Sequence, residues 1–395
     1  MDTQPGVSPD ADVIARARTA AKVVEAAGSQ IEATRELPPE VRAALLDAGV
    51  FRLLLPRSIG GHEVSIPTFA EVAMILARAD ASTAWCVGQG GGCSMSASFL
   101  APDAAQRLFG PRDAVLAWGA GVQGVAVEVP GGYRVSGKWS FASGSRHATL
   151  LGAHCRVVDA DGKPRLSADG SRADRTALFS RDKAQIIDVW QVMGLKGTGS
   201  DTYSVEDLFV PAADTIDRES LATAFQSGTL YRFPTMMIYA AAFGGVMLGI
   251  SRGMLDDLTS LALTKTARGA ASSLRDSEMF HADLARLEAR WRAVRHYHFG
   301  TFEGIWRTVD GGAPLTLEHR VDARLASTHT INEACQIAVD AYRAAGQHAI
   351  FESAPFERRL RDALSASQQV QGRPAHFATV GRHLLGLPLD TQMFV

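Results

Sequence analysis

Residues 119–208 constrain the fold of this chain most, because they form the only long region with the pattern of β-structure. Residues 125–129 and 133–137 alternate apolar and polar side chains on either side of Pro130-Gly131-Gly132, which predicts a β-hairpin. The regions before and after are helical in pattern. A β-rich middle between two helical arms predicts segregated domains and not repeated βαβ units.

The two arms differ in the helices that they predict. In the first arm, residues 38–49 have proline at the start of a helix and glycine just past its end. The capping-box spacing of Thr68 and Glu71 predicts another helix start. In the second arm, residues 234–267 are strongly apolar, and residues 280–298 and 315–345 each carry one apolar stripe at three-to-four spacing. Long antiparallel helices of this kind predict a bundle. We therefore expect an α+β protein with an N-terminal helical domain (1–115), a central β-barrel or sandwich domain (116–225) and a C-terminal four-helix bundle (226–395).

Composition restricts the class of protein. The chain has 395 residues, 46% of them hydrophobic and 21% charged, which is ordinary for a soluble globular protein of two or three domains. A formal net charge of −2 gives no electrostatic reason to expect nucleic acid or a membrane surface as partner. The four cysteines match no C-x-x-C pattern, no signal peptide is recognisable, and no apolar run reaches the ~20 residues of a membrane span. We expect a cytoplasmic protein with reduced thiols.

Glycines 88 to 92 are an unusual composition for a buried helix. They follow Ser82-Thr83-Ala84-Trp85 and would let a flat ligand, another chain or simply a neighbouring helix approach closely. The sequence leaves these alternatives open.

Several segments resemble one superfamily. Residues 131–144 (GGYRVSGKWSFASG) resemble the flavin-facing hairpin and strand of the acyl-CoA dehydrogenase fold, most closely in its reduced-flavin-dependent, two-component (group D) monooxygenases. The S-x-A-W segment at 82–85, the glycine-rich turn at 194–200 and the R-D-A segment at 361–363 resemble the same branch, in the same order. The resemblance covers roughly residues 38–388 and includes the order of the three domains.

The resemblance implies a reduced flavin, FADH2 or FMNH2, with O2 as co-substrate. A flavin ring needs an apolar wall over one face and hydrogen-bonding groups along its edges. Arg268 resembles an arginine that reaches the flavin pyrophosphate of a neighbouring subunit. For Trp139 and Phe141, the residues alone favour a place in the sheet core, whereas the resemblance favours the flavin wall. The full set of implied cofactor-binding residues is Trp118, Trp139, Ser140, Phe141, Ala142, Ser143, Arg268, Gly346 and Gln347.

The chemistry of the dehydrogenase branch is disfavoured. That branch needs a glutamate to remove a weakly acidic proton, at one of two positions. In this chain the corresponding segments are 367–372 and 239–242, and neither contains a carboxylate. An amide cannot accept a carbon-bound proton at neutral pH.

The oxygenase branch has different requirements, namely water exclusion and hydrogen bonds around flavin N5. Phenol-hydroxylating members place histidines where this chain has Gln369 and the glycines 90–92. The resemblance therefore implies a monooxygenase that acts through a flavin C4a-hydroperoxide on a hydrophobic aromatic or heteroaromatic small molecule, without a histidine base. Candidate catalytic residues are Ser143, Gln369 and His376, with His147 and His348 as alternatives that are more often structural.

The remaining motifs concern partners and rival functions. No glycine-rich segment of the chain lies in a predicted βαβ unit, which a dinucleotide fingerprint requires, so the resemblance implies a separate NAD(P)H-dependent flavin reductase. The resemblance also implies a homotetramer, which is the usual oligomeric state in the superfamily. Walker A and zinc-ligand spacings are absent from the sequence, and no hydrolase is expected. The alternatives are a flavin oxidoreductase with a non-thioester substrate and a non-catalytic flavin-fold protein.

Overall fold

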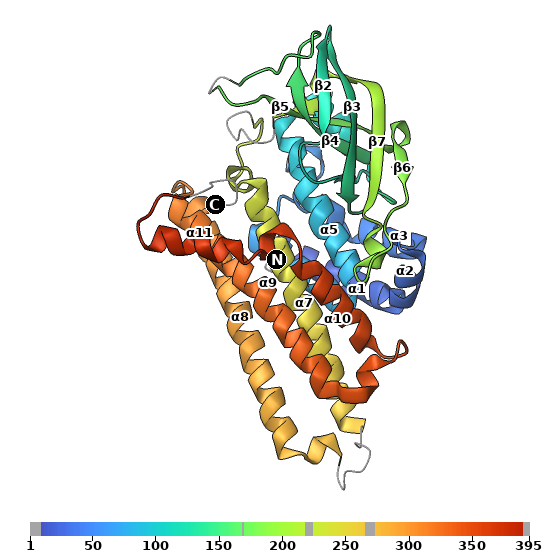
Figure 1. Cartoon of the computed structure of the whole chain (residues 1–395), viewed down its shortest axis with the longest axis vertical. Helices are drawn as coiled ribbons and strands as arrows, with labels where there is room; N and C mark the ends of the chain where they lie inside the picture. The colour runs from blue at the N-terminus through green and yellow to red at the C-terminus, as the bar shows by residue number, and fades with distance from the viewer. Residues whose placement is uncertain (1–8, 168–169, 218–223, 265–272, 390–395) are drawn as a thin grey trace, which may run out of the picture.

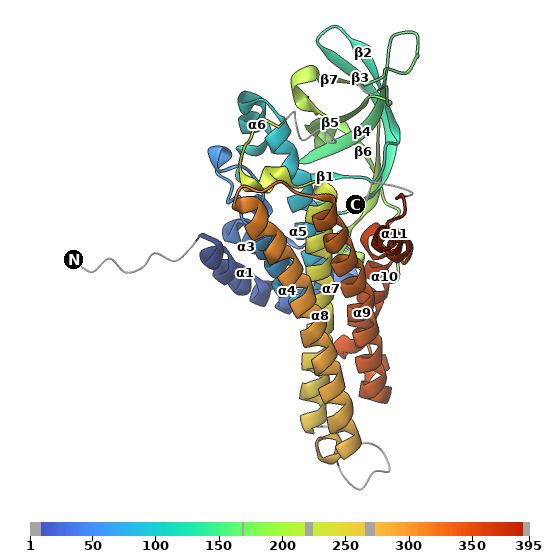
Figure 2. The same cartoon turned by 90° about the vertical axis from the view of Figure 1, so that its left-hand side faces the viewer.

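The computed structural model describes residues 9–167, 170–217, 224–264 and 273–389. A β-sheet lies at one end of the molecule and a long helical bundle at the other, as Figure 1 shows. In Figure 2 the N-terminal helices α1 and α3 lie on one side of the bundle, and α10 and α11 lie on the other. This arrangement confirms the predicted fold class.

The N-terminal region contains six helices within its described residues: α1 (Pro9–Ala26), α2 (Gly28–Thr34), α3 (Pro39–Ala48), α4 (Ile66–Ala79), α5 (Ala81–Ser94) and α6 (Pro102–Phe109). Helix α3 begins with proline and ends at Gly49, whose φ of 71° suits glycine, as its sequence predicts. The start predicted at Thr68 is wrong. Ser65 is the actual cap, because its side chain accepts the Thr68 N–H, and α4 has already begun at Ile66.

The central strands form one mixed sheet. They are β1 (Leu116–Trp118), β2 (Gly124–Val129), β3 (Gly132–Ala142), β4 (Leu150–Val158), β5 (Asp174–Ser180), β6 (Gln185–Ile187), β7 (Asp201–Pro211) and β8 (Thr215–Ile216). Their order is β6-β7-β3-β2-β4-β5-β8, with β1 paired to β4. The pairs β1–β4 and β2–β4 are parallel, and the others are antiparallel. The predicted hairpin is confirmed: β2 and β3 pair around Gly131, whose φ is 81°.

The C-terminal region is mainly helical in its described residues. It contains α7 (Thr235–Thr264), α8 (Glu278–Asp310), α9 (Leu317–Ala345), α10 (Pro355–Ser367) and α11 (Ala375–Leu384). Helix α7 is long and apolar enough to cross a membrane, but 94% of its most apolar window is buried inside the protein, as in a core helix. The predicted stripe of α8 is confirmed, since Phe280, Leu287 and Val294 are buried against the bundle.

Helix α5 connects the sheet end to the bundle (Figure 1). Its glycines allow α4 and α7 to pack closely against it. A Cβ on Gly92 would lie 2.2 Å from the Tyr239 ring of α7, and one on Gly91 would lie 2.5 Å from the Phe69 ring of α4. These glycines therefore serve close helix packing within the chain, which decides between the alternatives that the sequence left open.

Candidate active site

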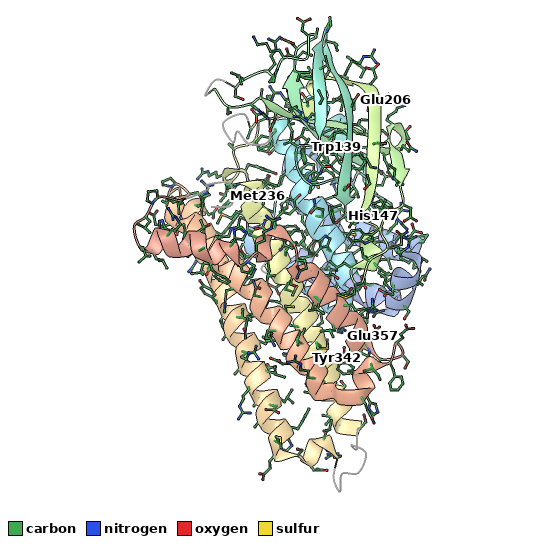
Figure 3. All side chains as sticks on the ribbon, in the orientation of Figure 1. Trp139, His147, Glu206, Met236, Tyr342 and Glu357 are labelled. Carbon is green, nitrogen blue, oxygen red and sulfur yellow. The ribbon has the colours of Figure 1, made fainter. Side chains whose placement is uncertain are left out.

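Two aromatic residues near the end of β3 have opposite surroundings. Trp139 has no exposed surface, its ring stacks on Tyr203 at 5.4 Å, and its Nε1 donates to the His154 carbonyl at 3.0 Å. Figure 3 shows Trp139 within the sheet. Trp139 belongs to the sheet core, which corrects the expectation that its ring faces a flavin. Trp118 is also buried, with its ring edge-on to His154 at 4.8 Å.

Phe141, in contrast, is 65% exposed. The pairing of β3 with β7 shifts register between Trp139 and Ala142, and Phe141 has a φ of 63°. This irregularity turns Phe141 out of the sheet. Its ring meets the Trp190 ring edge-on at 6.1 Å, so the two form an aromatic wall at the end of the sheet. Sequence reasoning missed Trp190 in this wall, because only the fold brings it to Phe141.

Beside this wall, three hydroxyl groups form a continuous chain that we call the hydroxyl chain: Thr198, Ser200 and Ser143. The Thr198 and Ser200 oxygens are 2.7 Å apart, and so are those of Ser200 and Ser143. Trp85 of α5 donates its Nε1–H to Ser143 Oγ at 3.1 Å. The structure thus joins three segments that carried the resemblance, those around residues 85, 143 and 198. Trp85, Thr198 and Ser200 were not among the predicted site residues, although their motifs were recognised.

The other predicted contacts on β3 are less direct. Ala142 is fully buried, and Ser140 accepts a hydrogen bond from Thr202 at 3.0 Å. Both residues are adjacent to Phe141 in the strand. The hydrogen bond to α5 is made by the next residue, Ser143.

An aromatic stack continues from Trp85 into the bundle. Trp85 stacks on Phe243 of α7 at 4.2 Å, and Phe243 is parallel to Tyr239 at 5.7 Å. Gln89, one turn after Trp85, donates to the Tyr239 hydroxyl at 3.2 Å. Tyr239 lies in the second segment where a dehydrogenase would carry its glutamate. The place therefore holds a phenol bonded to an amide, and no carboxylate.

Gln369 and His376 lie elsewhere, around the short turn Val370–Gly372 packed on α9. Gln369 Oε1 accepts the Gln371 N–H at 2.7 Å, and its buried Nε2 has no partner among the described residues. His376 Nε2 is 2.6 Å from the Val370 carbonyl, and burial lowers the pKa of His376. Between described residues, no hydrogen bond joins either side chain to Ser143. Gln371 links this turn to α7, because its Nε2 donates to the Met236 carbonyl at 3.3 Å.

The remaining predicted residues are spread over the chain. His147 is buried, and burial lowers its pKa to about 3, so it is a very weak base. Figure 3 places it below Trp139, where the sheet meets the helices. His348, Gly346 and Gln347 are exposed in the turn Gly346–Ile350. Arg268 lies outside the described residues.

The junction of sheet and bundle has the chemistry that a flavin ring requires. Phe141 supplies an exposed apolar face, and its neighbour Ser143, which is 7% exposed, supplies a hydroxyl group. An isoalloxazine ring is flat, apolar on its faces and polar at its edge, so these residues fit it.

Known proteins resemble this chain along most of its length. Residues 14–108 match the family model for the acyl-CoA dehydrogenase N-terminal domain, and residues 241–371 match a model for the C-terminal domain. Indole-3-acetate monooxygenase of Pseudomonas putida is 29% identical over 86% of this chain and 85% of that protein. The pigment production hydroxylase of Rhodococcus erythropolis is 26% identical over 94% of this chain and 96% of that protein.

Solved structures share the whole fold. XiaF from Streptomyces sp., in complex with FADH2 and glycerol, has a TM-score of 0.89 and 24% identity over 97% of each chain. The HsaA monooxygenase from M. tuberculosis has a TM-score of 0.87 and 25% identity over 97% of this chain and 99% of that one. The chain therefore belongs to the acyl-CoA dehydrogenase-fold flavoproteins, in their flavin-dependent monooxygenase branch.

Proposed function

We propose that this chain is the oxygenase component of a two-component monooxygenase that uses reduced flavin and O2 to hydroxylate an aromatic or heteroaromatic small molecule. The observation that carries the proposal is the exposed Phe141 beside the Ser143 hydroxyl, at the junction with Trp85 of α5. The similarity to an indole-3-acetate monooxygenase supports a bicyclic heteroaromatic substrate. The proposal includes a location in the cytoplasm.

The bound reduced flavin would supply the electrons that activate O2. The residues of this chain would bind and shield it: Phe141 and Trp190 as a wall, Ser143 at the ring edge, and the Trp85–Phe243–Tyr239 stack as a water-excluding apolar layer. These residues include no carboxylate, histidine or lysine that could act as the base. A substrate whose own ring carbon is electron-rich needs none, which favours an indole-like ring over a phenol that must be deprotonated.

The same proposal includes a second subunit and a separate reductase. Arg268, Gly346 and Gln347 would bind the flavin phosphates across a subunit contact. Exposed apolar side chains support a contact there, since Ile350 is 62% and Phe351 is 56% exposed directly after Gly346 and Gln347. A homotetramer would satisfy this arrangement. The reductase would be a distinct NAD(P)H-dependent protein that delivers free reduced flavin.

An anaerobic titration with FADH2 and with FMNH2, followed by a pulse of 18O2 in the presence of indole-3-acetate, tests the proposal. We expect tight binding of one or both reduced flavins and one 18O atom in the product. Oxidised flavin that is bleached by substrate without oxygen would instead establish a dehydrogenase-like enzyme. Absence of binding in either redox state would leave the non-catalytic alternative.

A further inference from the structure

Helix α5 has one face that the surrounding protein leaves partly open. All of its residues are buried except Trp85 and Gln89, which are partly exposed. Residues four apart lie on the same face of a helix, about 6 Å apart along its axis. Trp85 is at the junction of sheet and bundle, because it donates to Ser143 there. Gln89 therefore lies on the same open face, one turn away from the junction.

The carboxamide of Gln89 is oriented by its neighbours. Its Nε2 donates to the Tyr239 hydroxyl at 3.2 Å and to the Cys93 sulfur at 3.7 Å, so both of its N–H groups are used within the protein. The carboxamide oxygen has no hydrogen-bond partner among the described residues. Gln89 thus offers a ligand on the open face of α5 a hydrogen-bond acceptor and no donor.

Tyr239, which holds the nitrogen of this carboxamide, is itself fixed by packing. Its ring is parallel to that of Phe243 at 5.7 Å, and a Cβ on Gly92 would lie 2.2 Å from it. Its hydroxyl is also 3.6 Å from the Cys93 sulfur, to which it can donate while its oxygen accepts from Gln89. The orientation of the carboxamide therefore depends on α7 as well as α5, which lie side by side in Figure 1.

The same face carries an aromatic surface for a planar ring. Trp85 stacks on Phe243 at 4.2 Å with 24° between the ring planes. The one helical turn between Trp85 and Gln89 is comparable to the length of a bicyclic aromatic ring. A ring of this size that lies along the face would have one end at the junction and the other end beside the Gln89 oxygen.

We propose that Gln89 determines substrate specificity, because its carboxamide oxygen accepts a hydrogen bond from a ring N–H of a bicyclic substrate such as an indole. A phenolate would place a second acceptor against this oxygen. A ring without a donor, such as benzothiophene, would leave the oxygen unpaired and out of contact with water. The inference rests on the proposed function, because it assigns the substrate of that enzyme.

The experiment compares indole with benzothiophene, in which a sulfur atom replaces the ring N–H. Their dissociation constants are measured by calorimetry, anaerobically and in the presence of reduced flavin. We expect the unmodified protein to bind indole more tightly. Gln89→Leu should lower the ratio of the benzothiophene constant to the indole constant about tenfold, the factor that one hydrogen bond gives, through weaker binding of indole.

Three further variants sharpen the measurement. Gln89→Glu keeps an acceptor oxygen and should keep the preference for indole. Tyr239→Phe removes the hydroxyl that orients the carboxamide, and it should lower the ratio by less than Gln89→Leu does. Gln123→Leu is the matched control, since Gln123 is an exposed glutamine whose Nε2 donates to the Ala120 carbonyl at 2.8 Å, between β1 and β2. It should leave the ratio unchanged.

The possible outcomes separate this inference from the proposed function. If Gln89→Leu weakens both ligands equally, or changes neither constant, the residue serves packing and the inference is overturned, whereas 18O in an aromatic product would still support the proposed function. If the ratio falls as expected but no oxygen enters any aromatic product, the assignment of the ligand stands and the monooxygenase proposal fails. If the unmodified protein binds neither ring, the inference is overturned.

Discussion

Trp139, in the sheet interior, and Phe141, at the junction of sheet and bundle, belong to the same strand pattern but differ in their exposure to solvent. Residues two apart on a regular strand point to the same face, so the alternation in β3 places both rings together. The shift of register after Trp139 and the positive φ of Phe141 separate them, and one ring is fully buried while the other is 65% exposed.

The polar side chains of the two regions also have different kinds of hydrogen-bond partner. In the sheet interior, Trp139 and Tyr203 donate to the backbone carbonyls of His154 and Gly152, which any sequence would supply. At the junction, Ser143 is bonded by side chains from α5 and from the turn before β7. The interior therefore depends on packing, whereas the junction depends on particular side chains.

The largest expected effect is on the interior. Trp139→Ala should lower the free energy of unfolding by about 3–5 kcal/mol, because it leaves a large cavity against Tyr203. Equilibrium unfolding in urea measures this. An unfolding free energy within about 1 kcal/mol of the unmodified protein would contradict the assignment of Trp139 to the core.

The second expected effect is a pH dependence of the unfolding free energy, caused by Asp362, whose carboxyl accepts the Leu195 N–H in the turn before β7. Burial, reinforced by Asp80, raises the pKa of Asp362 to about 7, although the hydrogen bond from the Leu195 N–H acts to lower it. An unfolded aspartate titrates near 4, so between roughly pH 4 and 7 the folded state binds the extra proton and stability falls as pH rises.

Asp362→Asn keeps an acceptor for the Leu195 N–H and removes this proton. Between pH 5 and 6 its unfolding free energy should therefore rise, relative to the unmodified protein, by up to about 1.4 kcal/mol. Urea unfolding of both proteins across this range measures the difference. Parallel pH profiles would show that Asp362 is ionised throughout.

The smallest expected effect is on the exposed ring. Phe141→Ala should weaken reduced-flavin binding about fivefold through loss of aromatic contact, with a change in unfolding free energy below about 1 kcal/mol. Phe209→Ala is the matched control, since Phe209 is 43% exposed on β7 and lies outside the junction. Equal losses of flavin affinity in both variants would remove Phe141 from the site.

Much of the fold could be predicted because its signals are local. Proline and glycine set the ends of α3, Gly131 sets the hairpin, and the spacing from Phe280 to Val294 sets the buried face of α8. The absence of a carboxylate at both base positions is likewise evident from the residues alone, and it separates this chain from the dehydrogenases of the same fold.

The sequence by itself therefore determined the order of domains, the family and the missing base, since each depends on neighbours along the chain. Only the tertiary structure decided that Trp139 is core and Phe141 is exposed, and that Trp85, Ser143 and Ser200 converge. The physical reason is that the direction of a hydrogen bond depends on every partner at once. Here those partners come from α5, the turn after β3 and the turn before β7, and no local pattern relates them.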